Sequence, residues 1–484
     1  MKSCWNLLSI LVLSSFLSST LADYTCSPSI TINPPVNISN AWFYPNTWND
    51  SLPAPTYAAG QNCSWIINIP KGMYAWVSVN ASTNTQSSLT LVDSVSYSTR
   101  IEDAGLEPFF LLDPSFTVTL QAVQMGTFGI RVQWYNVRPV IATSWSVRAN
   151  SSPLALYAGD FDNSTVIRAD TQVSLLATHP RIFGTNYFLR ATQVYDGPSI
   201  NSTHLGNLYQ VLSSGKNLVS SGTYLTLYSL QYGLTVGNAV VLQDYTNVNQ
   251  FKSYQAVYCT IPDACPVSLD ATNGTAAAIH FNELFFVKQL SMATNNTMSV
   301  YTNYFSNSNK LADYTYSNYL TSIPQKFPGT FTTFVLDNDH ASFQLASTAL
   351  NADWSSAVDG RRGFFSSANY GIINSNQDFD DQVTAVKYSN ISYTVDRPAL
   401  FGQSTLNVTI TYKQNIVLNN VYTVSNYPGP PVYALGDSIT VSYKLNGGVS
   451  SGPFVSFGFD SYSSASTHGI FVTIVLAVWM IISL

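Results

Sequence analysis

The densest acidic clusters in the 484-residue chain are Asp337-Asn338-Asp339 and Asp378-Phe379-Asp380-Asp381. Paired carboxylates can hold a cation or, at a suitable separation, hydrolyse a glycosidic bond. Acidic clusters also form polar turns between strands, and a carboxylate-dependent glycosidase would require these two clusters to converge. The sequence contains no Gly-x-Ser-x-Gly elbow, HExxH motif, phosphate loop or dinucleotide fingerprint. We therefore expect a protein without catalytic residues or cofactors.

The histidines add no metal-binding or catalytic pattern to the acidic clusters. The five histidines are His179, His204, His280, His340 and His468. None has a partner at metal-ligand spacing, so we expect each to be a structural or solvated side chain. His204 follows a glycosylation sequon and is expected in a loop.

Cysteine usage indicates an oxidising compartment. Cys4 lies in the signal-like segment described below, and the remaining cysteines are Cys26, Cys63, Cys259 and Cys265. An even number in a secreted chain favours disulfides. Of the three possible pairings we predict the local one, which joins the first two cysteines and the last two. Zinc is disfavoured because there is no CxxC motif and no histidine beside either pair.

Residues 1–22 are similar to a secretory signal peptide. Lys2 supplies the positive charge, Leu7–Leu17 the apolar stretch, and Thr20-Leu21-Ala22 a cleavage site of small residues. An apolar stretch of about eleven residues is too short to span a bilayer. We expect an exported chain.

Residues 460–484 combine small polar residues with the uncharged apolar segment Gly469–Leu484. A spanning helix would need about 20 apolar residues and normally a basic flank. A buried core helix would need a polar face toward solvent, which this segment lacks. The pattern is typical of a glycosylphosphatidylinositol (GPI) attachment signal. Ser463, followed by two small residues, and Ser461, which has the longer spacer, are the candidate attachment residues.

Asn-x-Ser/Thr sequons occur along the whole chain. In an exported protein they become glycosylation acceptors that mark surface positions, although some sequons arise by chance in an Asn- and Ser-rich chain. The expected acceptors are Asn37, Asn49, Asn80, Asn150, Asn163, Asn201, Asn273, Asn295, Asn390 and Asn407. Asn62 is set aside because its middle residue is Cys63, whose pairing competes with glycan transfer.

Composition and alternation determine the predicted fold class. Hydrophobic residues make up 46% of the chain, which excludes wholesale disorder. There are 20 Lys and Arg against 26 Asp and Glu with no basic block, so no nucleic-acid partner is expected. Period-two alternation predicts strands at Ser64–Pro70, Met73–Ser82, Phe116–Leu120 and Phe128–Trp134. The chain is therefore predicted to be all-β, built from tandem antiparallel β-sandwiches.

A weak internal repeat divides the chain into four predicted units. In each unit one alternating strand is followed by another after a similar interval. The pairs are marked by Asp93 and Phe116, Asp196 and Tyr224, Tyr301 and Phe331, and Tyr412 and Ile439. The spacing of the pairs predicts sandwich domains at 23–138, 139–259, 260–358 and 359–459. The last two rest on strand patterns alone.

The first unit contains a more specific combination of motifs. These are Cys26, Trp42-Phe43-Tyr44-Pro45, Gln61-Asn62-Cys63-Ser64-Trp65, Ile69-Pro70-Lys71-Gly72, Asp93, Phe109-Phe110 and Trp134. Together they resemble the nematode CUB-like domain family, which implies jelly-roll sandwiches. In the second unit Val194–Ser199, Leu205–Leu208 and Leu218–Leu230 resemble the ordinary CUB order, without its cysteines except Cys259.

Many CUB domains bind Ca²⁺ through acidic residues at one end of the sandwich, and the resemblance makes Asp196 a weak candidate ligand. Leu225–Gly233 lacks the acidic residue that would complete the set. Because Asp-Gly-Pro-Ser is strong turn chemistry in its own right, we expect a turn residue and no metal site.

The C-terminal segment and the sequons lead us to expect a non-enzymatic glycoprotein on the extracellular face of the plasma membrane, held there by a GPI lipid. The resemblance implies a surface protein of a nematode epithelium such as gut. Its CUB-like modules would bind an unidentified protein or carbohydrate. Many members of the family take part in responses to pathogens, so innate defence is the expected process. A structural or adhesive surface protein without an immune role is the leading alternative.

Overall fold

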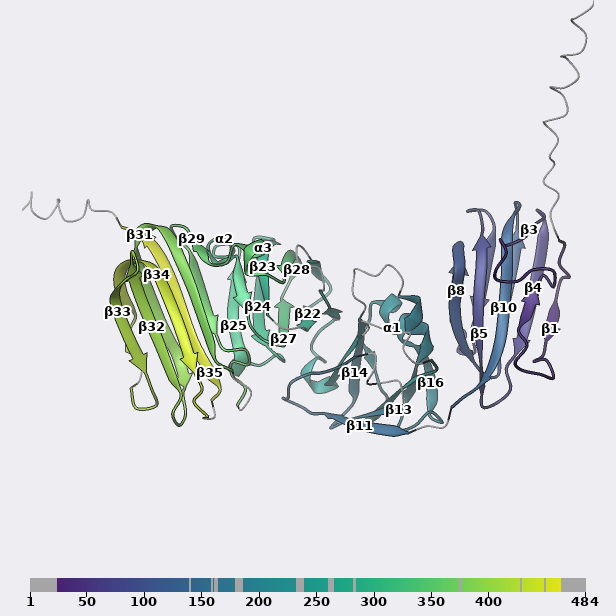
Figure 1. Cartoon of the computed structure of the whole chain (residues 1–484), viewed down its shortest axis with the longest axis horizontal. Coiled ribbons are helices and arrows are strands. Elements are labelled where there is room, and N and C mark those ends of the chain that lie inside the picture. Colours follow the sequence, from purple (N-terminus) through teal and green to yellow (C-terminus); the bar gives the residue numbers. More distant parts are fainter. Residues whose placement is uncertain are drawn as a thin grey trace, which may run out of the picture.

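The computed structural model describes residues 24–462, apart from 139–140, 158–159, 161–163, 179–185, 232–238, 260–264, 282–283, 374–376, 427–428 and 448–449. Almost all of its regular structure is β-strand. Four units follow one another in sequence order along the longest axis of the molecule, the first three with two sheets each and the fourth with one seven-stranded sheet (Figure 1). We call them units 1 to 4.

Unit 1 is a sandwich of two sheets. Its strands are β1 (Ile30–Ile32), β2 (Trp42–Tyr44), β3 (Thr56–Tyr57), β4 (Gln61–Asn68), β5 (Met73–Ser82), β6 (Ser88–Val92), β7 (Ser98–Ile101), β8 (Asp103–Leu112), β9 (Ser115–Ala122) and β10 (Gly126–Asn136). One sheet has the order β1-β4-β9-β6-β7, and we call it sheet I. The other, sheet II, has the order β2-β10-β5-β8, with β3 added beside β10.

Units 2 and 3 repeat this topology. Unit 2 contains β11 (Ala142–Val147), β12 (Leu154–Tyr157), β13 (Ser164–Ala169), β14 (Val173–Thr178), η2 (Tyr187–Ala191), β15 (Thr192–Asp196), β16 (Thr203–Asn207), α1 (Leu208–Ser214), β17 (Leu218–Val219), β18 (Tyr224–Ser229), β19 (Ala239–Asp244) and η3 (Tyr245–Asn247). Unit 3 contains β20 (Ser253–Val257), β21 (Cys265–Ala271), β22 (Ala276–Phe281), β23 (Phe285–Met292), β24 (Thr297–Thr302), η4 (Asn307–Asn309), β25 (Lys310–Thr315), α2 (Tyr319–Ser322), β26 (Gln325–Phe327), β27 (Phe331–Leu336) and β28 (Asp339–Ala346). Sheet I is β11-β13-β18-β15-β16 in unit 2 and β20-β22-β27-β24-β25 in unit 3. Sheet II is β12-β19-β14-β17 and β21-β28-β23-β26, so the strand order matches unit 1 when β3 is left out.

Unit 4 is a variant of the same arrangement. After α3 (Ala349–Ala352) it contains β29 (Ser356–Ala357), β30 (Arg362–Ser366), β31 (Phe379–Ala399), β32 (Thr405–Tyr412), β33 (Asn415–Tyr422), β34 (Val432–Lys444) and β35 (Gly452–Ser461). The first part of β31 pairs with β29 and β34, its middle part Ser389–Tyr393 pairs with both β34 and β35, and its last part pairs with β35 alone. The long strand β31 therefore joins the two halves of one continuous sheet and replaces two strands of the other units.

The predicted strands of unit 1 are confirmed with small shifts at their ends. β5 has the predicted bounds, whereas β4 begins and ends earlier than Ser64–Pro70. Their inward residues, including Trp65, Ile67, Val77 and Val79, are fully buried. Alternation in half-buried strands thus identified the core side of each sheet.

The repeat pairs found in the sequence belong to neighbouring strands. β6 pairs with β9, β15 with β18, β24 with β27, and β32 with β34. The all-β fold is as predicted, and most pairs are antiparallel. Each unit also contains one parallel pair of strands: β1 with β4, β11 with β13, β20 with β22, and β29 with β31. Alternation does not reveal strand direction, so the sequence did not indicate these pairs.

Successive units 1 to 3 stack by a constant rule. Outward residues of sheet II in unit 1, such as Phe110, pack on outward residues of sheet I in unit 2, such as Tyr195 and Tyr228. Leu176 and Val241 of sheet II in unit 2 pack in the same way on sheet I of unit 3. Unit 4 departs from the rule because it packs on the β26 edge of unit 3.

Candidate functional site

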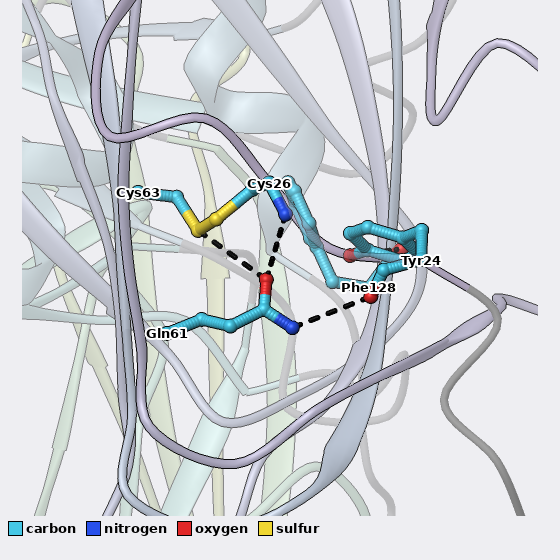
Figure 2. Close-up of a disulfide and its surroundings, with 5 residues drawn as sticks. All are labelled: Tyr24, Cys26, Gln61, Cys63 and Phe128. Atoms are coloured by element: carbon cyan, nitrogen blue, oxygen red, sulfur yellow. Dashed lines mark hydrogen bonds between the residues drawn. A yellow bond between two sulfur atoms is a disulfide. The ribbon is translucent and has the colours of Figure 1, made fainter.

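The first disulfide closes the start of unit 1. Cys26 and Cys63 are bonded, with 6.0 Å between their Cα atoms, which is ordinary disulfide geometry. The Gln61 side chain accepts the backbone N–H of Cys26 at 2.8 Å and donates to the Tyr24 carbonyl oxygen at 3.3 Å (Figure 2). The Tyr24 hydroxyl in turn donates to the Phe128 carbonyl oxygen at 3.1 Å. The bond therefore ties the incoming chain to both sheets of unit 1, and the predicted pairing is confirmed.

The second disulfide joins Cys259, which follows β20, to Cys265, the first residue of β21. Their Cα atoms are 5.9 Å apart and both side chains are buried. Because β20 belongs to sheet I and β21 to sheet II, this bond holds the two layers of unit 3 together. This local pairing is also as predicted.

Most described sequons lie at exposed positions. The exposed asparagines are Asn37, Asn49, Asn150, Asn201, Asn273 and Asn295. Asn80, Asn390 and Asn407 are half-buried within strands, which qualifies the expectation that every sequon marks an exposed residue. Asn163 lies outside the described residues. Acceptor use at these positions remains a prediction.

The two acidic clusters have separate local roles. Asp337 accepts the Thr297 backbone N–H at 2.8 Å, while Asp378 accepts the Leu445 backbone N–H at 2.7 Å. The Leu445 hydrogen bond, aided by Lys444, lowers the pKa of Asp378. Asp381 forms a buried ion pair with Lys326 at the junction of units 3 and 4. These carboxylates fasten turns and an interface.

Asp339 and Asp380 complete the two clusters. Asp339 is the first residue of β28, has a positive φ of 55°, and lies 4.0 Å from the His340 ring. Asp380 pairs in register with Ser442 near the start of β31. Neither residue lines the groove described below, so the arrangement offers no paired-carboxylate site there.

The described histidines occupy three different environments. His280 is buried, which lowers its pKa to about 3. His204 lies in strand β16, not in the expected loop, and its Nε2 atom is 2.9 Å from Gln193 Oε1. Burial lowers its pKa. His340 is exposed, with Nδ1 3.5 Å from an oxygen of Asp270. His179 and His468 lie outside the described residues.

Asp196 is the last residue of β15, and both of its carboxylate oxygens accept the Ser221 backbone N–H, at 3.0 and 3.2 Å. That hydrogen bond fits the predicted turn role. Within the described ranges, no three His, Cys, Asp or Glu residues gather in a way that could hold a metal ion.

The predicted attachment segment is described only at its start. Ser461 ends β35 and donates its backbone N–H to Asp359 Oδ1 at 2.6 Å. Ser463 and the apolar segment that follows lie outside the described residues. In the part of the chain that is described, no helix has the length and apolar character to cross a membrane.

The junction of units 1 and 2 contains a buried ion pair. Arg190 of η2 donates to Glu107 of β8 at 2.5 Å and to the Pro108 carbonyl oxygen at 3.1 Å. The guanidinium lies 3.9 Å from the Phe109 ring centroid and 4.2 Å from that of Tyr209. Such ion-pair and cation–π contacts fix the relative orientation of two domains.

Among the described residues, none of another unit stacks on the outward face of sheet II in unit 3. On sheet II of unit 3, outward residues of three neighbouring strands form a polar floor. Ser268 pairs in register with Ser342, and Ser342 with Ser291. All three are exposed. Gln344 and Gln289 form the next row along the same strands.

Two adjoining hollows of about 420 and 520 Å³ lie over this floor and share the three serines, so they form one groove. The groove is shallow and open to solvent, although its two volumes lie within the range of ligand sites. Tyr319 and Leu320 of α2 line one end, and Asp270 and His340 line the other. Hydrogen bonds from Thr272 lower the pKa of Asp270.

Among the groove residues, we named only His340 from the sequence, when we tested the histidines for metal binding or catalysis. The alternation of Cys265–Ala271, in which the buried apolar residues are separated by Pro266, Ser268 and Asp270, was available as a signal for an exposed face. It did not show that the face is hollow, because the hollow depends on neighbouring strands and on α2.

Comparisons with known proteins agree with an extracellular modular chain. Residues 21–138 match the family model of the CUB-like domain. Residues 146–230 and 246–348 match two domains of unknown function, DUF7592 and DUF7591. No curated protein matches the chain.

Two solved structures illustrate the range of structural similarity. The CUB1-EGF-CUB2 region of human MASP-1/3 is 9% identical, with a TM-score of 0.18 over 41% of this chain and 93% of that one. The M60 catalytic domain with two CBM51 domains of Clostridium perfringens ZmpB is 4% identical, with a TM-score of 0.14 over 84% and 34%. Neither score is high enough to support an argument.

The fold, the disulfide in unit 1 and the family match agree for the first unit. The CUB-like domain indicates an extracellular binding module, and two further sandwiches coincide with domains of unknown function. The chain therefore contains a CUB-like domain at residues 21–138.

Proposed function

We propose that this protein is a non-enzymatic, GPI-anchored extracellular glycoprotein that displays its sandwich units as binding modules. The CUB-like unit at 21–138, closed by the Cys26–Cys63 disulfide, carries the proposal. Disulfides persist in oxidising compartments, and six of the described sequons present an exposed asparagine. Both features support export.

The acidic clusters support the non-enzymatic part of the proposal. Their carboxylates bond to backbone groups, to Lys326 and to Lys444, which are structural contacts. An enzyme needs acids and bases that converge on one reacting atom. In this proposal the exposed sheet faces and loops bind ligands, and buried junctions hold the units rigidly in one array.

Lipid anchoring rests on the sequence from Ser461 onward, where small polar residues precede an uncharged apolar segment. Phosphatidylinositol-specific phospholipase C should release the protein from the surface of expressing cells into the medium. A chain ending at Tyr462 should appear in the medium without treatment. Retention of the full chain after effective treatment would contradict the anchor and favour a spanning helix.

The proposed process is the response to pathogens in a nematode epithelium, which rests on the resemblance to the CUB-like family. A null mutant should survive less well on pathogens than its parent. Normal survival of a strain that also lacks related genes would contradict this process and favour an adhesive or structural role.

A further inference from the structure

The groove lies on the outward face of sheet II in unit 3. A following unit would cover this face if it stacked as unit 3 stacks on unit 2. In unit 2 the central row of sheet II is Ala155, Val241 and Leu176, and the last two are buried against unit 3. In unit 3 the corresponding three-strand row is Ser268, Ser342 and Ser291. The row in unit 2 carries aliphatic side chains, whereas the row in unit 3 carries hydroxyl groups. The face of unit 3 therefore does not suit packing against another apolar sheet.

Unit 4 leaves this face open because it attaches elsewhere. Phe364 of β30 enters the core of unit 3 and lies 5.7 Å from the Phe327 ring of the β26 edge. Trp354 contacts Phe286 at 6.0 Å, near the end of β23. These contacts lie beside the groove and not on its serine floor.

The groove lining is mainly polar, includes Lys288 as well as Asp270 and His340, and suits a hydroxyl-rich occupant. Ser and Gln side chains supply donors and acceptors along the floor, and Tyr319 supplies an aromatic side chain at one end. At the other end, the Asp270 carboxylate and the His340 ring lie 3.5 Å apart. Carbohydrate has the matching chemistry, because its hydroxyls pair with amides and hydroxyls while its C–H faces pack on aromatic rings.

A carbohydrate attachment position lies directly beside this end of the groove. Ala293 lines the hollow, and the exposed Asn295 of the sequon Asn295-Asn296-Thr297 follows two residues later. The turn is held in place because buried Asn296 donates to the His340 carbonyl oxygen at 3.1 Å and Thr297 donates its N–H to Asp337. The turn that carries the attachment residue is thereby held beside the His340 backbone.

The other sequon of unit 3 lies in the turn between β21 and β22, which packs beside the start of sheet I. Asn273 precedes Gly274, whose surroundings are the side chain of Lys252, at the start of sheet I. Lys252 also donates its backbone N–H to the Thr275 carbonyl oxygen. Of the two sequons, Asn295 is therefore the one placed to fill the groove.

We propose that the groove over Ser268, Ser342 and Ser291 is the seat of the N-linked glycan carried by Asn295. The inference rests on the export that the proposed function requires. The inner sugars lie on the serine floor and reach toward Tyr319. The glycan thus covers the one sheet II face among units 1 to 3 that no neighbouring unit covers.

Native deglycosylation kinetics test this proposal. The full chain is solubilised in mild detergent, treated with peptide-N-glycosidase F without denaturation, and followed site by site by mass spectrometry. Release at Asn295 should be at least about tenfold slower than at exposed Asn37, because a seated glycan must first leave its groove. Ser342→Tyr fills the groove and should abolish the difference, whereas Ser98→Tyr, at an exposed strand position of unit 1, should preserve it.

Several outcomes would overturn the proposal. Equal release at Asn295 and Asn37 would do so, as would a slow site unaffected by Ser342→Tyr in a variant whose thermal unfolding is unchanged. Glycan at Asn37 with none at Asn295 would overturn the inference while leaving export intact. Binding of free mannohexaose to the untreated wild-type chain, lost in Ser342→Tyr, would assign the groove to an external ligand.

Discussion

The ion pair between Glu107 and Arg190 makes a strong prediction about how units 1 and 2 are joined. The side chains are only 9% and 4% exposed, and aromatic rings pack around the guanidinium. Glu107→Gln leaves the arginine charge buried without its counter-charge. Because water cannot reach the guanidinium, we expect the junction to lose about 3–5 kcal/mol of stability.

The chain offers a matched control for this change. Arg100 and Glu102 form an ion pair at 3.3 Å in the same unit, but their side chains are 51% and 65% exposed. Glu102→Gln should therefore cost less than about 1 kcal/mol. The double variant Glu107→Gln/Arg190→Leu removes both buried charges and should recover much of the loss.

Native-state hydrogen exchange of β8 and β15, which lie on the two sides of the junction, measures the free energy of local opening. Glu107→Gln should lower it in both strands while leaving unit 4 unchanged. An effect no larger than that of Glu102→Gln would refute the reasoning, because it would show that Arg190 finds water or another partner. Unfolding of unit 1 alone, without change in β15, would show that the pair does not couple the units.

Three further predictions concern stability. Burial lowers the pKa of His280 in the folded state to about 3, so the neutral ring stabilises the fold above about pH 6.5 and this stabilisation is lost as the pH falls. Urea titrations should show that the free energy of unfolding falls by about 2 kcal/mol between pH 7 and pH 5. His280→Gln should abolish this pH dependence. Replacing Cys26 and Cys63 together by alanine opens a loop of 37 residues and should cost about 4 kcal/mol by chain entropy, measured by denaturant unfolding of unit 1; no change would contradict that account. Phe364→Ala should destabilise unit 3 as well as unit 4 by about 3–5 kcal/mol, because its ring lies in the core of unit 3; an effect confined to unit 4 in hydrogen exchange would contradict the shared core.

Alternation and spacing predicted the local part of this structure. β5 was predicted residue by residue because Ala75, Val77 and Val79 alternate with residues that can face outward. The short sequence separation within each cysteine pair led us to predict the disulfides that the structure shows. These features depend on neighbours in the sequence, and a single sequence contains that information.

Features that depend on distant segments were not predictable in this way. Nothing in Phe379–Ala399 indicates that one strand joins the two halves of a seven-stranded sheet, because alternation continues on both sides of the irregularity after Thr384. Arg190 is one of few charges, and its partner lies 83 residues earlier. The groove on unit 3 likewise requires knowledge of where unit 4 attaches. The domain boundaries themselves stay a prediction.

The chemistry of the outward sheet faces explains where the stacking stops. Faces that meet another unit, such as those with Tyr195 and Tyr228 or Val241, are apolar. The outward row Ser64, Thr119 and Thr90 on sheet I of unit 1, which begins the series, carries hydroxyls instead. Polar outer faces are what terminal repeats need for solubility.

Unit 4 follows the same logic on its outer layer, where Thr440, Thr409 and Asn419 pair in register across β34, β32 and β33. Sheet II of unit 3 differs from these two faces. Its hydroxyl row lies inside the series of units and not at one of its ends. A terminal face needs only water, but this interior face carries a shallow hollow lined by residues of unit 3 alone. That difference is the reason to look for a specific occupant at Ser342 and not at Thr119 or Thr409.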